Sequence, residues 1–380
     1  MPFDSSHHPR SQVTQRHTIE FEPEPATVLT MSSVAPLISL LRHGFIPGSD
    51  RIVDSYGRTF TYLRVSVTDL CNLRCVYCMP DEGMKWLPRD EILSFEEIVT
   101  VVEAAAAVGV YKIRLTGGEP LVRSDIAILT GMVARVPGIS DLALTTNGTR
   151  LAELAAPLAQ AGLKRINISL DTMDPVKFKA IARRHELGEV LDGIRAARAA
   201  GLDPIKINMV VLGGLNDDEV TDFAAMTLEQ NLDMRFIEYM PLEEAKGCAM
   251  GSGNFGFVSN AVTKERIAAR FGALEALETG EGMKGPAEVF RLKGAAGRLG
   301  FISAMSAPFC KKCDRLRLTA TGEIRSCLLD GGGISIKPLL RNGGTRGDII
   351  QAFRESAHIK PEVHKDWADI PSASMSRIGG

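Results

Sequence analysis

The sequence has no excess of charge of one sign. Its 44 lysine and arginine residues nearly balance its 46 aspartate and glutamate residues, which leaves a formal net charge of −2. Proteins that bind nucleic acid over a broad surface carry a basic excess, so we expect no stable nucleic-acid partner and expect any anionic ligand to meet local cations. Long apolar runs are also missing, since none reaches the roughly 20 residues of a membrane-spanning helix. We therefore expect no membrane partner.

The N-terminus lacks the apolar core of a secretion signal, since it reads MPFDSSHHPRSQ. Residues 1–45 are polar and contain proline and serine, which predicts a disordered extension. The cysteines number seven, an odd count that does not suit a set of disulfides. We expect a cytoplasmic protein whose thiols bind metal in a reducing compartment.

Short β-like runs alternate with helical patterns from Leu63 onward. The predicted strands are 63–68, 111–116, 141–146, 165–170, 205–211 and 234–239. The predicted helices between and after them are 95–108, 124–135, 150–161, 174–183, 188–200 and 217–230. Strands separated by helices form right-handed βαβ units with a parallel sheet. The sequence therefore predicts an α/β fold with an incomplete (β/α)6 barrel of the TIM type.

The barrel is expected to span residues 46–258. A smaller α+β domain follows over residues 259–368, with helices near 260–271, 335–341 and 345–357, and a flexible tail covers 369–380.

The predicted strands carry charged and polar side chains on one face. Leu63, Val65 and Val67 alternate with Arg64, and Ile166 and Ile168 alternate with Asn167 and Ser169. Unpaired charges cannot be buried in an apolar core, so we infer that the polar faces line a wet lumen that holds a charged ligand. The alternative is an antiparallel sheet whose polar face meets solvent.

Three cysteines, Cys71, Cys75 and Cys78, lie directly after the first predicted strand. Three thiols cannot all pair as disulfides, but they hold a metal centre and leave one position open. A four-iron cluster with three cysteine ligands has one iron without a protein ligand. The alternative is a structural zinc ion with a distant fourth ligand.

A second group comprises Cys310, Cys313 and Cys327, with no histidine between them. It predicts either a second iron–sulfur cluster with one open iron or a zinc knuckle completed by Cys248 or an acidic residue. Arg315 and Arg317 follow on one face of a strand, where two guanidinium groups are able to clamp a phosphate bidentately. The alternative is that they only compensate the charge of the thiolates.

Cations of the barrel strands add to this clamp. Arg64, Arg114 and Lys206 are expected to face the same lumen. A nucleoside triphosphate carries about four negative charges, so the five cations together are its expected complement. Taken one at a time, each of these side chains is equally compatible with a solvated surface.

The run Gly117-Gly118-Glu119-Pro120 ends the second predicted strand, where active sites of barrels lie. Glycine lets the backbone approach a ligand closely, and Glu119 is able to accept hydrogen bonds from an ammonium group. The alternative is an ordinary turn.

The first cysteine triplet, with Tyr77 before Cys78, resembles the radical S-adenosylmethionine (SAM) superfamily. The resemblance implies that the open iron binds SAM, whose cleavage yields a 5′-deoxyadenosyl radical that abstracts hydrogen. It also implies that Gly118 and Glu119 hold the methionyl amine, and that Ser169 and Met240 line the SAM pocket with Tyr77.

From about residue 46 onward, the chain resembles the GTP 3′,8-cyclase family of molybdenum cofactor biosynthesis. The resemblance is carried by both cysteine groups, the GGEP turn and the CDRLR run. The resemblance implies two [4Fe-4S] clusters, with guanine on the second, and a GTP triphosphate held by Arg64, Arg114, Lys206, Arg315 and Arg317, with Thr145 adding a hydrogen bond. Hydrogen abstraction from C3′ and attack on C8 would give (8S)-3′,8-cyclo-7,8-dihydroguanosine 5′-triphosphate. Arg315, Arg317 and the terminal Gly379 and Gly380 are the expected catalytic residues, whereas Cys248 is expected to be a bystander.

The remaining expectations concern partners and alternatives. The resemblance implies an electron-donor protein or other reductant and a monomer or homodimer. The runner-up enzyme is a radical SAM peptide-modifying enzyme with an auxiliary cluster, and the non-enzyme alternative is a zinc-bearing binding module.

Overall fold

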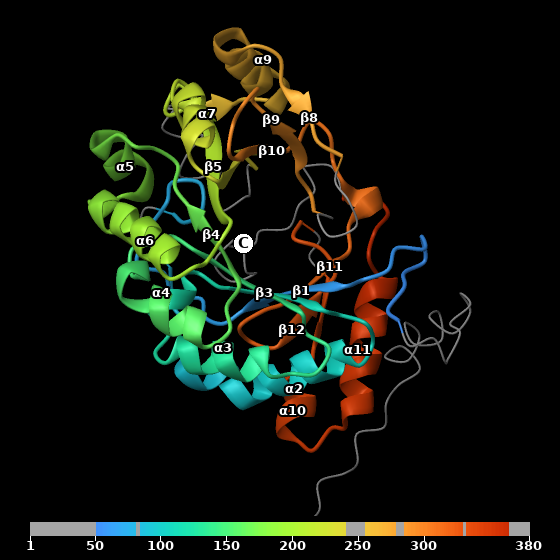
Figure 1. Cartoon of the computed structure of the whole chain (residues 1–380). Helices are drawn as coiled ribbons and strands as arrows, with labels where there is room; N and C mark the ends of the chain where they lie inside the picture. The colour runs from blue at the N-terminus through green and yellow to red at the C-terminus, as the bar shows by residue number, and fades with distance from the viewer. Residues whose placement is uncertain (1–50, 81–83, 241–254, 279–284, 330–331, 365–380) are drawn as a thin grey trace, which may run out of the picture. The chain divides into compact units, whose positions relative to one another are not determined.

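Six parallel strands form the centre of the fold (Figure 1). The computed structural model describes residues 51–80, 84–240, 255–278, 285–329 and 332–364. The strands pair in chain order, each with the next. They are β1 (Tyr62–Ser66), β2 (Lys112–Thr116), β3 (Asp141–Thr146), β4 (Arg165–Ser169), β5 (Ile205–Gly213) and β6 (Leu232–Glu238).

Helices connect these strands and cover the outer side of the sheet (Figure 1). They are α2 (Phe95–Ala106), α3 (Ile126–Ala134), α4 (Leu151–Gln160), α5 (Pro175–Ala182), α6 (Leu187–Ala199) and α7 (Val220–Glu229), with short 3-10 turns η1 (Arg89–Glu91) and η2 (Pro120–Val122). Parallel pairing excludes the antiparallel alternative. The predicted incomplete (β/α)6 barrel is confirmed.

Local sequence signals explain where these elements begin and end. Ser94 caps α2, because its hydroxyl accepts the Glu97 N–H at 3.1 Å while the Glu97 carboxylate accepts the Ser94 N–H at 2.7 Å. Strand β5 continues to Gly213, beyond the predicted end, because β7 (Gly256–Phe257) pairs with its last residues. Helix α7 begins later than predicted, because the Asp217 carboxylate accepts the Gly214 N–H and closes a turn there.

The alternation along the strands separates two environments, as predicted. The apolar residues Leu63, Val65, Ile166 and Ile168 are fully buried in the core under the helices. The polar residues of the other phase line a cavity on the inner side of the sheet. The strand period therefore assigns each side chain either to the core or to the cavity.

The C-terminal part of the chain extends the same sheet at both edges. Its elements are α9 (Asn260–Phe271), β8 (Glu275–Ala276), β9 (Glu288–Arg291), β10 (Arg298–Ile302), η5 (Cys310–Lys312), β11 (Arg315–Leu318), β12 (Glu323–Arg325), β13 (Gly333–Ser335), α10 (Lys337–Arg341) and α11 (Arg346–His358). Strand β11 pairs in parallel with β1, and β10 pairs in parallel with β6. Both open edges of the incomplete barrel are therefore covered by later strands.

The expected boundary between residues 258 and 259 stays a prediction. The expected extension 1–45, the tail 369–380 and Cys248 lie outside the described residues. Within the described ranges, no helix has both the length and the apolar character to cross a membrane.

Phe301 joins β10 to the barrel core, and its removal should be costly. Its buried ring stacks on Phe236 of β6 with 5.5 Å between centroids and meets the edge of Phe290 at 5.6 Å. We expect Phe301→Ala to lower the free energy of unfolding by about 3–5 kcal/mol, measured by chemical denaturation. Phe257→Ala is the control, because Phe257 is half exposed and its loss should cost only about 0.5 kcal/mol. Equal effects would show that β10 is not packed on this core.

Candidate active site

The first cysteine triplet lies on a loop after β1 that the barrel backbone holds in place. Within the loop, the N–H groups of Cys78 and Met79 donate to the Cys75 carbonyl at 2.9 and 3.0 Å. The N–H groups of Arg74 and Val76 donate to the carbonyls that end α5, those of residues 182 and 181. All three thiols are half buried. They are therefore fixed relative to one another and to the inner side of the sheet.

The glycines after β2 let this loop approach the sheet. A Cβ on Gly117 would lie 2.6 Å from the Thr68 carbonyl oxygen, and one on Gly118 would lie 2.4 Å from those of Asp69 and Leu70. The Gly118 and Glu119 N–H groups donate to the Thr68 and Leu70 carbonyls at 2.8 and 2.7 Å. Glycine is thus required at these two positions because the backbone after β2 packs directly against the segment that leads into the cysteine loop.

Glu119 links the ends of β2 and β3. Its Oε1 accepts the Leu121 N–H at 2.9 Å and the Thr146 hydroxyl at 2.7 Å, and its Oε2 accepts the Asn147 N–H at 2.6 Å. Burial raises the pKa of this carboxyl to about 7, although the three donors act to lower it. A carboxylate has about four acceptor positions, so one on Oε2 is left for a ligand ammonium.

Burial is the main influence on the Cys71 and Cys75 thiols of the cysteine loop, and nearby acidic groups add to it. Burial and then the Glu119 carboxylate raise the pKa of the Cys71 thiol to about 12, and burial followed by Asp171 raises the pKa of Cys75 well above its usual range. These thiols ionise only against a positive metal centre. In the described part of the chain, no three cysteine, histidine or acidic side chains converge to hold a single metal ion. Each thiol of a four-iron cube binds a different iron, so three thiols on one loop fit such a cluster.

A small pocket of about 30 Å³ lies beside Cys75. Tyr77, Ser169 and Asp171 line both this pocket and the large cavity of the barrel. The Tyr77 hydroxyl donates to Asp171 Oδ2 at 2.7 Å, and the Val210 N–H donates to Oδ1 at 2.9 Å. Burial raises the pKa of Asp171 to about 6. Cys75 of the first triplet therefore lies beside a pocket that shares wall residues with the large cavity.

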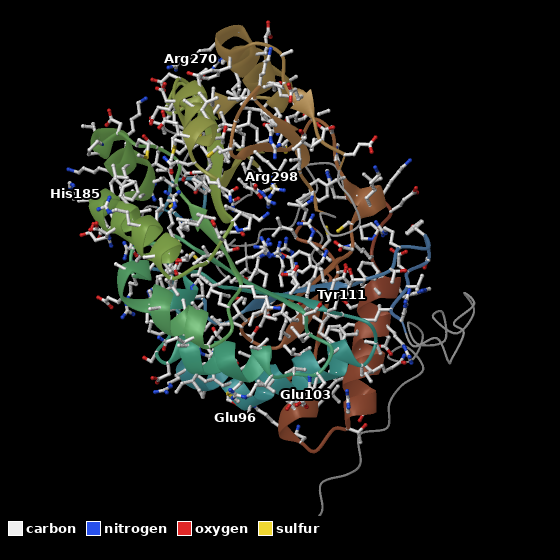
Figure 2. All side chains as sticks on the ribbon, in the orientation of Figure 1. Glu96, Glu103, Tyr111, His185, Arg270 and Arg298 are labelled. Carbon is white, nitrogen blue, oxygen red and sulfur yellow. The ribbon has the colours of Figure 1, made fainter. Side chains whose placement is uncertain are left out.

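The large cavity has a volume of about 350 Å³ and a strongly cationic wall. Figure 2 shows side-chain nitrogen atoms gathered on the inner side of the strands, whereas Glu96, Glu103 and Arg270 lie on the outer helices and His185 lies in the connection between α5 and α6. Acidic residues on the wall are Asp141, Asp171 and Asp233. The cations on the wall are Arg58, Arg64, Lys112, Arg114, Arg165, Lys206, Arg235, Arg298, Arg315, Arg317 and Lys360.

Arg317, Arg64 and Arg114 lie abreast on β11, β1 and β2, because the strand register pairs Arg64 with both of the others. Burial, and next the charge of Arg317, lowers the pKa of Arg64 well below its usual value. Burial, followed by Arg315, lowers the pKa of Arg317 to about 10. Among the described residues, Nε of Arg64 and Nε of Arg114 have no hydrogen-bond partner. A polyanion would relieve the repulsion and complete these hydrogen bonds.

Aspartates offset part of the charge of other cations in the cavity. Asp233 accepts Lys206 Nζ at 2.6 Å and Arg298 Nε at 2.7 Å, and Arg165 pairs with Asp141. Burial lowers the pKa of Lys206 to about 8, with Arg235 as the next cause. Net positive charge is therefore concentrated on the side of β11, β1 and β2.

The second cysteine group borders this cationic side. Cys310 begins η5, Cys313 precedes β11 and Cys327 follows β12, and all three line the large cavity. Burial acts to raise the pKa of Cys313, but Arg315 and Lys360 outweigh it, so the net shift is downward. The Arg315 and Lys360 charges thus favour the thiolate form at Cys313, whereas burial raises the pKa of Cys310.

Comparisons with known proteins match this architecture. Residues 65–227 match the radical SAM superfamily, and residues 232–366 match the family described as Molybdenum Cofactor Synthesis C. A GTP 3′,8-cyclase from Pelotomaculum thermopropionicum is 47% identical over 330 residues, which cover 86% of this chain and 99% of the relative. The chain belongs to the GTP 3′,8-cyclase family. A GTP 3′,8-cyclase from Geobacter sulfurreducens is 46% identical over 87% of this chain and 99% of the relative.

Solved structures show the same fold at low sequence identity. The crystal structure of Streptococcus suis SuiB bound to the precursor peptide SuiA is 13% identical, with a TM-score of 0.55 over 92% of this chain and 79% of that chain. At this identity the likeness concerns the fold alone. As a radical SAM family member, the protein uses a [4Fe-4S] cluster and SAM.

The structure brings the residues expected from the family resemblance into one region. Met240, Thr145 and Ser169 line the large cavity together with the five predicted cations. Gly379 and Gly380 lie outside the described residues. Their roles, and those of the other predicted site residues, stay predictions.

Sequence reasoning missed several cations of the cavity. Arg235 lies on the polar phase of its strand, so alternation alone was able to identify it. Arg58 and Lys360 lie outside regular strands, and no periodic signal marked them.

Glu119→Gln should destabilise the protein, because the amide nitrogen would face either the Asn147 N–H or the two donors at Oε1. A buried donor left without an acceptor costs about 1–3 kcal/mol. Thermal unfolding of the variant measures this loss. Glu153→Gln is the control, since the Glu153 side chain is 72% exposed and its loss should cost about 0.5 kcal/mol or less. A Glu119 variant as stable as this control would refute the linking role.

Proposed function

We propose that this protein is a lyase that converts GTP to (8S)-3′,8-cyclo-7,8-dihydroguanosine 5′-triphosphate in a SAM-dependent radical reaction, the first step of molybdenum cofactor biosynthesis. The observation that carries the proposal is a cavity lined by the second cysteine group and by a row of buried arginines, with a small pocket beside Cys75 that shares Tyr77, Ser169 and Asp171 with it. Membership in the GTP 3′,8-cyclase family supports the same reaction.

The first triplet, Cys71, Cys75 and Cys78, would hold the [4Fe-4S] cluster that meets SAM. When bound, this pair supplies the one-electron cleavage of SAM and the carbon radical that removes hydrogen from the substrate. Tyr77 and Ser169 border the pocket beside Cys75, and Met240 lies on the wall of the larger cavity. The open acceptor position of Glu119 and the backbone at Gly118 would orient the methionyl ammonium of SAM.

The second triplet, Cys310, Cys313 and Cys327, would hold a second [4Fe-4S] cluster whose open iron meets the guanine base. Its thiols face the large cavity, and Arg315 lies directly beside them on β11. Three protein ligands leave one iron for the substrate. The base would then be fixed at one end of the cavity.

The triphosphate would lie on the cationic side of the cavity. A charge of about −4 is matched by Arg317, Arg64 and Arg114 together with Arg315 and Lys206. Lys206 would exchange part of its contact with Asp233 for a phosphate oxygen. Thr145 on β3 would add a hydrogen bond.

The chain's task is to position C3′ of the ribose and to exclude other hydrogen donors. A substrate held at its base and at its phosphates has little freedom in the ribose between them. Arg315 and Arg317 would stabilise the bound nucleotide, and Gly379 and Gly380 are proposed to complete the site. An electron-donor protein or another reductant must supply the electron, and a monomer or homodimer is expected.

Anaerobic incubation with SAM, GTP and a reductant tests the function. Mass analysis should show an isomer of GTP together with 5′-deoxyadenosine. The purified protein should be brown and contain about eight irons per chain. Colourless protein with stoichiometric zinc would overturn the proposal, and so would 5′-deoxyadenosine formed without any change in GTP.

Arg317→Ala tests the phosphate clamp. Loss of a charge-assisted hydrogen-bond pair should weaken GTP binding roughly 10- to 100-fold, whereas guanosine, which has no phosphate, should bind nearly unchanged. Anaerobic calorimetry measures both affinities. Arg270→Ala, at a half-exposed arginine on α9, should change neither. If Arg317→Ala weakened the binding of GTP and of guanosine equally, Arg317 would not be a phosphate-binding residue.

A further inference from the structure

Arg58 is a buried arginine that lies before β1 and is bound by backbone carbonyls from distant segments. Its guanidinium donates to the carbonyls of Cys310 at 2.9 Å, Glu362 at 3.1 Å, Pro361 at 2.7 Å and Lys360 at 3.4 Å. Its Nε donates to Asp54, whose other oxygen accepts the Arg58 N–H at 2.8 Å. A planar fork with five donors makes this set of contacts, and a single ammonium group cannot.

Lys360 lies in the segment that Arg58 holds, and its ammonium group is buried between two cysteines of the second triplet. Its side chain donates to the Arg315 carbonyl at 3.1 Å and to the Ser326 carbonyl. These carbonyls lie two residues after Cys313 and one before Cys327. Lys360 is 4% exposed, so water screens its charge little.

The same segment also contacts the remaining cysteine. The His364 backbone hydrogen-bonds the Cys310 thiol and lowers its pKa, although burial has the larger, opposite effect. Residues 360–364, which we name the strap, therefore approach all three thiols. The strap contacts Cys310 directly and brings the Lys360 charge close enough to Cys313 and Cys327 to interact with both.

We infer that Arg58 and Lys360 are positioning residues for the metal centre of the second triplet: Arg58 fixes the strap against Cys310, and Lys360 places a positive charge beside Cys313 and Cys327. The inference rests on the proposed second cluster. It assigns two separate effects, one on retention of the cluster and one on its reduction potential.

Geometry and charge predict these two effects. Cluster ligands hold iron only when their sulfurs keep their spacing, and the strap joins the Cys310 turn to the strand ends that carry the other two cysteines. Reduction adds negative charge to a cluster, so a buried cation beside it stabilises the reduced form and raises its potential. Hydrogen bonds to the sulfurs act in the same direction.

Arg58→Lys tests the retention of iron. Lysine keeps the charge but loses the fork, so the variant reconstituted without oxygen should contain about four irons where the wild type contains about eight. The spectral signature of the first cluster should remain. Arg123→Lys is the matched control, because Arg123 is another partly buried arginine that donates to two backbone carbonyls, those of Val67 and Leu93.

The control should keep about eight irons. Iron content that stays at the wild-type level in Arg58→Lys would overturn the retention effect. Equal iron loss in both arginine variants would also overturn it, since the cause would then be general destabilisation.

Lys360→Met and Lys360→Arg test the effect of charge. A redox titration followed by electron paramagnetic resonance should show a more negative potential of the second cluster in the methionine variant, whereas arginine should keep it near the wild-type value. The first cluster should not change in either variant. Unchanged potentials in Lys360→Met would overturn this effect.

Two failures are distinguishable in these experiments. If the wild-type protein contained only about four irons, it would have no second cluster, and both the proposed function and this inference would be wrong. Wild-type protein with about eight irons and active on GTP, together with variants that match it, would overturn the inference alone.

Discussion

Repulsion among buried guanidinium groups is the constraint on which the rest of the site depends. Arg317, Arg64 and Arg114 are placed abreast by strand register, and burial together with like charge lowers the pKa values of Arg64 and Arg317. Such a row is stable only if an anion occupies the cavity or if its cost is offset by packing elsewhere. The apolar phase of the same strands supplies that packing, since it forms the core beneath the helices.

The two cysteine groups occupy different electrostatic environments. Burial, and next the nearby Glu119 and Asp171 carboxyl groups, raise the pKa values of Cys71 and Cys75 in the first triplet, whereas Arg315 and Lys360 act against burial to lower the pKa of Cys313 in the second. A metal centre with a less positive surrounding is harder to reduce. In the proposed enzyme, the first cluster would therefore be the harder of the two to reduce, and the second would lie beside the cations that hold the nucleotide.

The C-terminal strands make this arrangement possible. Strand β11 continues the sheet beyond β1 and adds Arg315 and Arg317 to the arginine row, and β10 continues it beyond β6 and adds Arg298 to the aspartate network. An incomplete barrel would otherwise expose two sheet edges to pairing with other chains. The same extension covers the edges and completes the wall of the cavity.

The sequence by itself determined the strands, the helices and the division of each strand into an apolar and a polar face, because these follow from local periodicity and caps such as Ser94. Cysteine spacing likewise marked both triplets. The sequence also grouped five cations in one lumen, but only the tertiary structure decided which of them are neighbours, since Arg64 and Arg317 are far apart in the chain and lie side by side through pairing of β1 with β11. The contacts of Arg58 and Lys360 with backbone carbonyls also had no sequence signal, because a carbonyl acceptor is present at every residue and only folding selects those that converge.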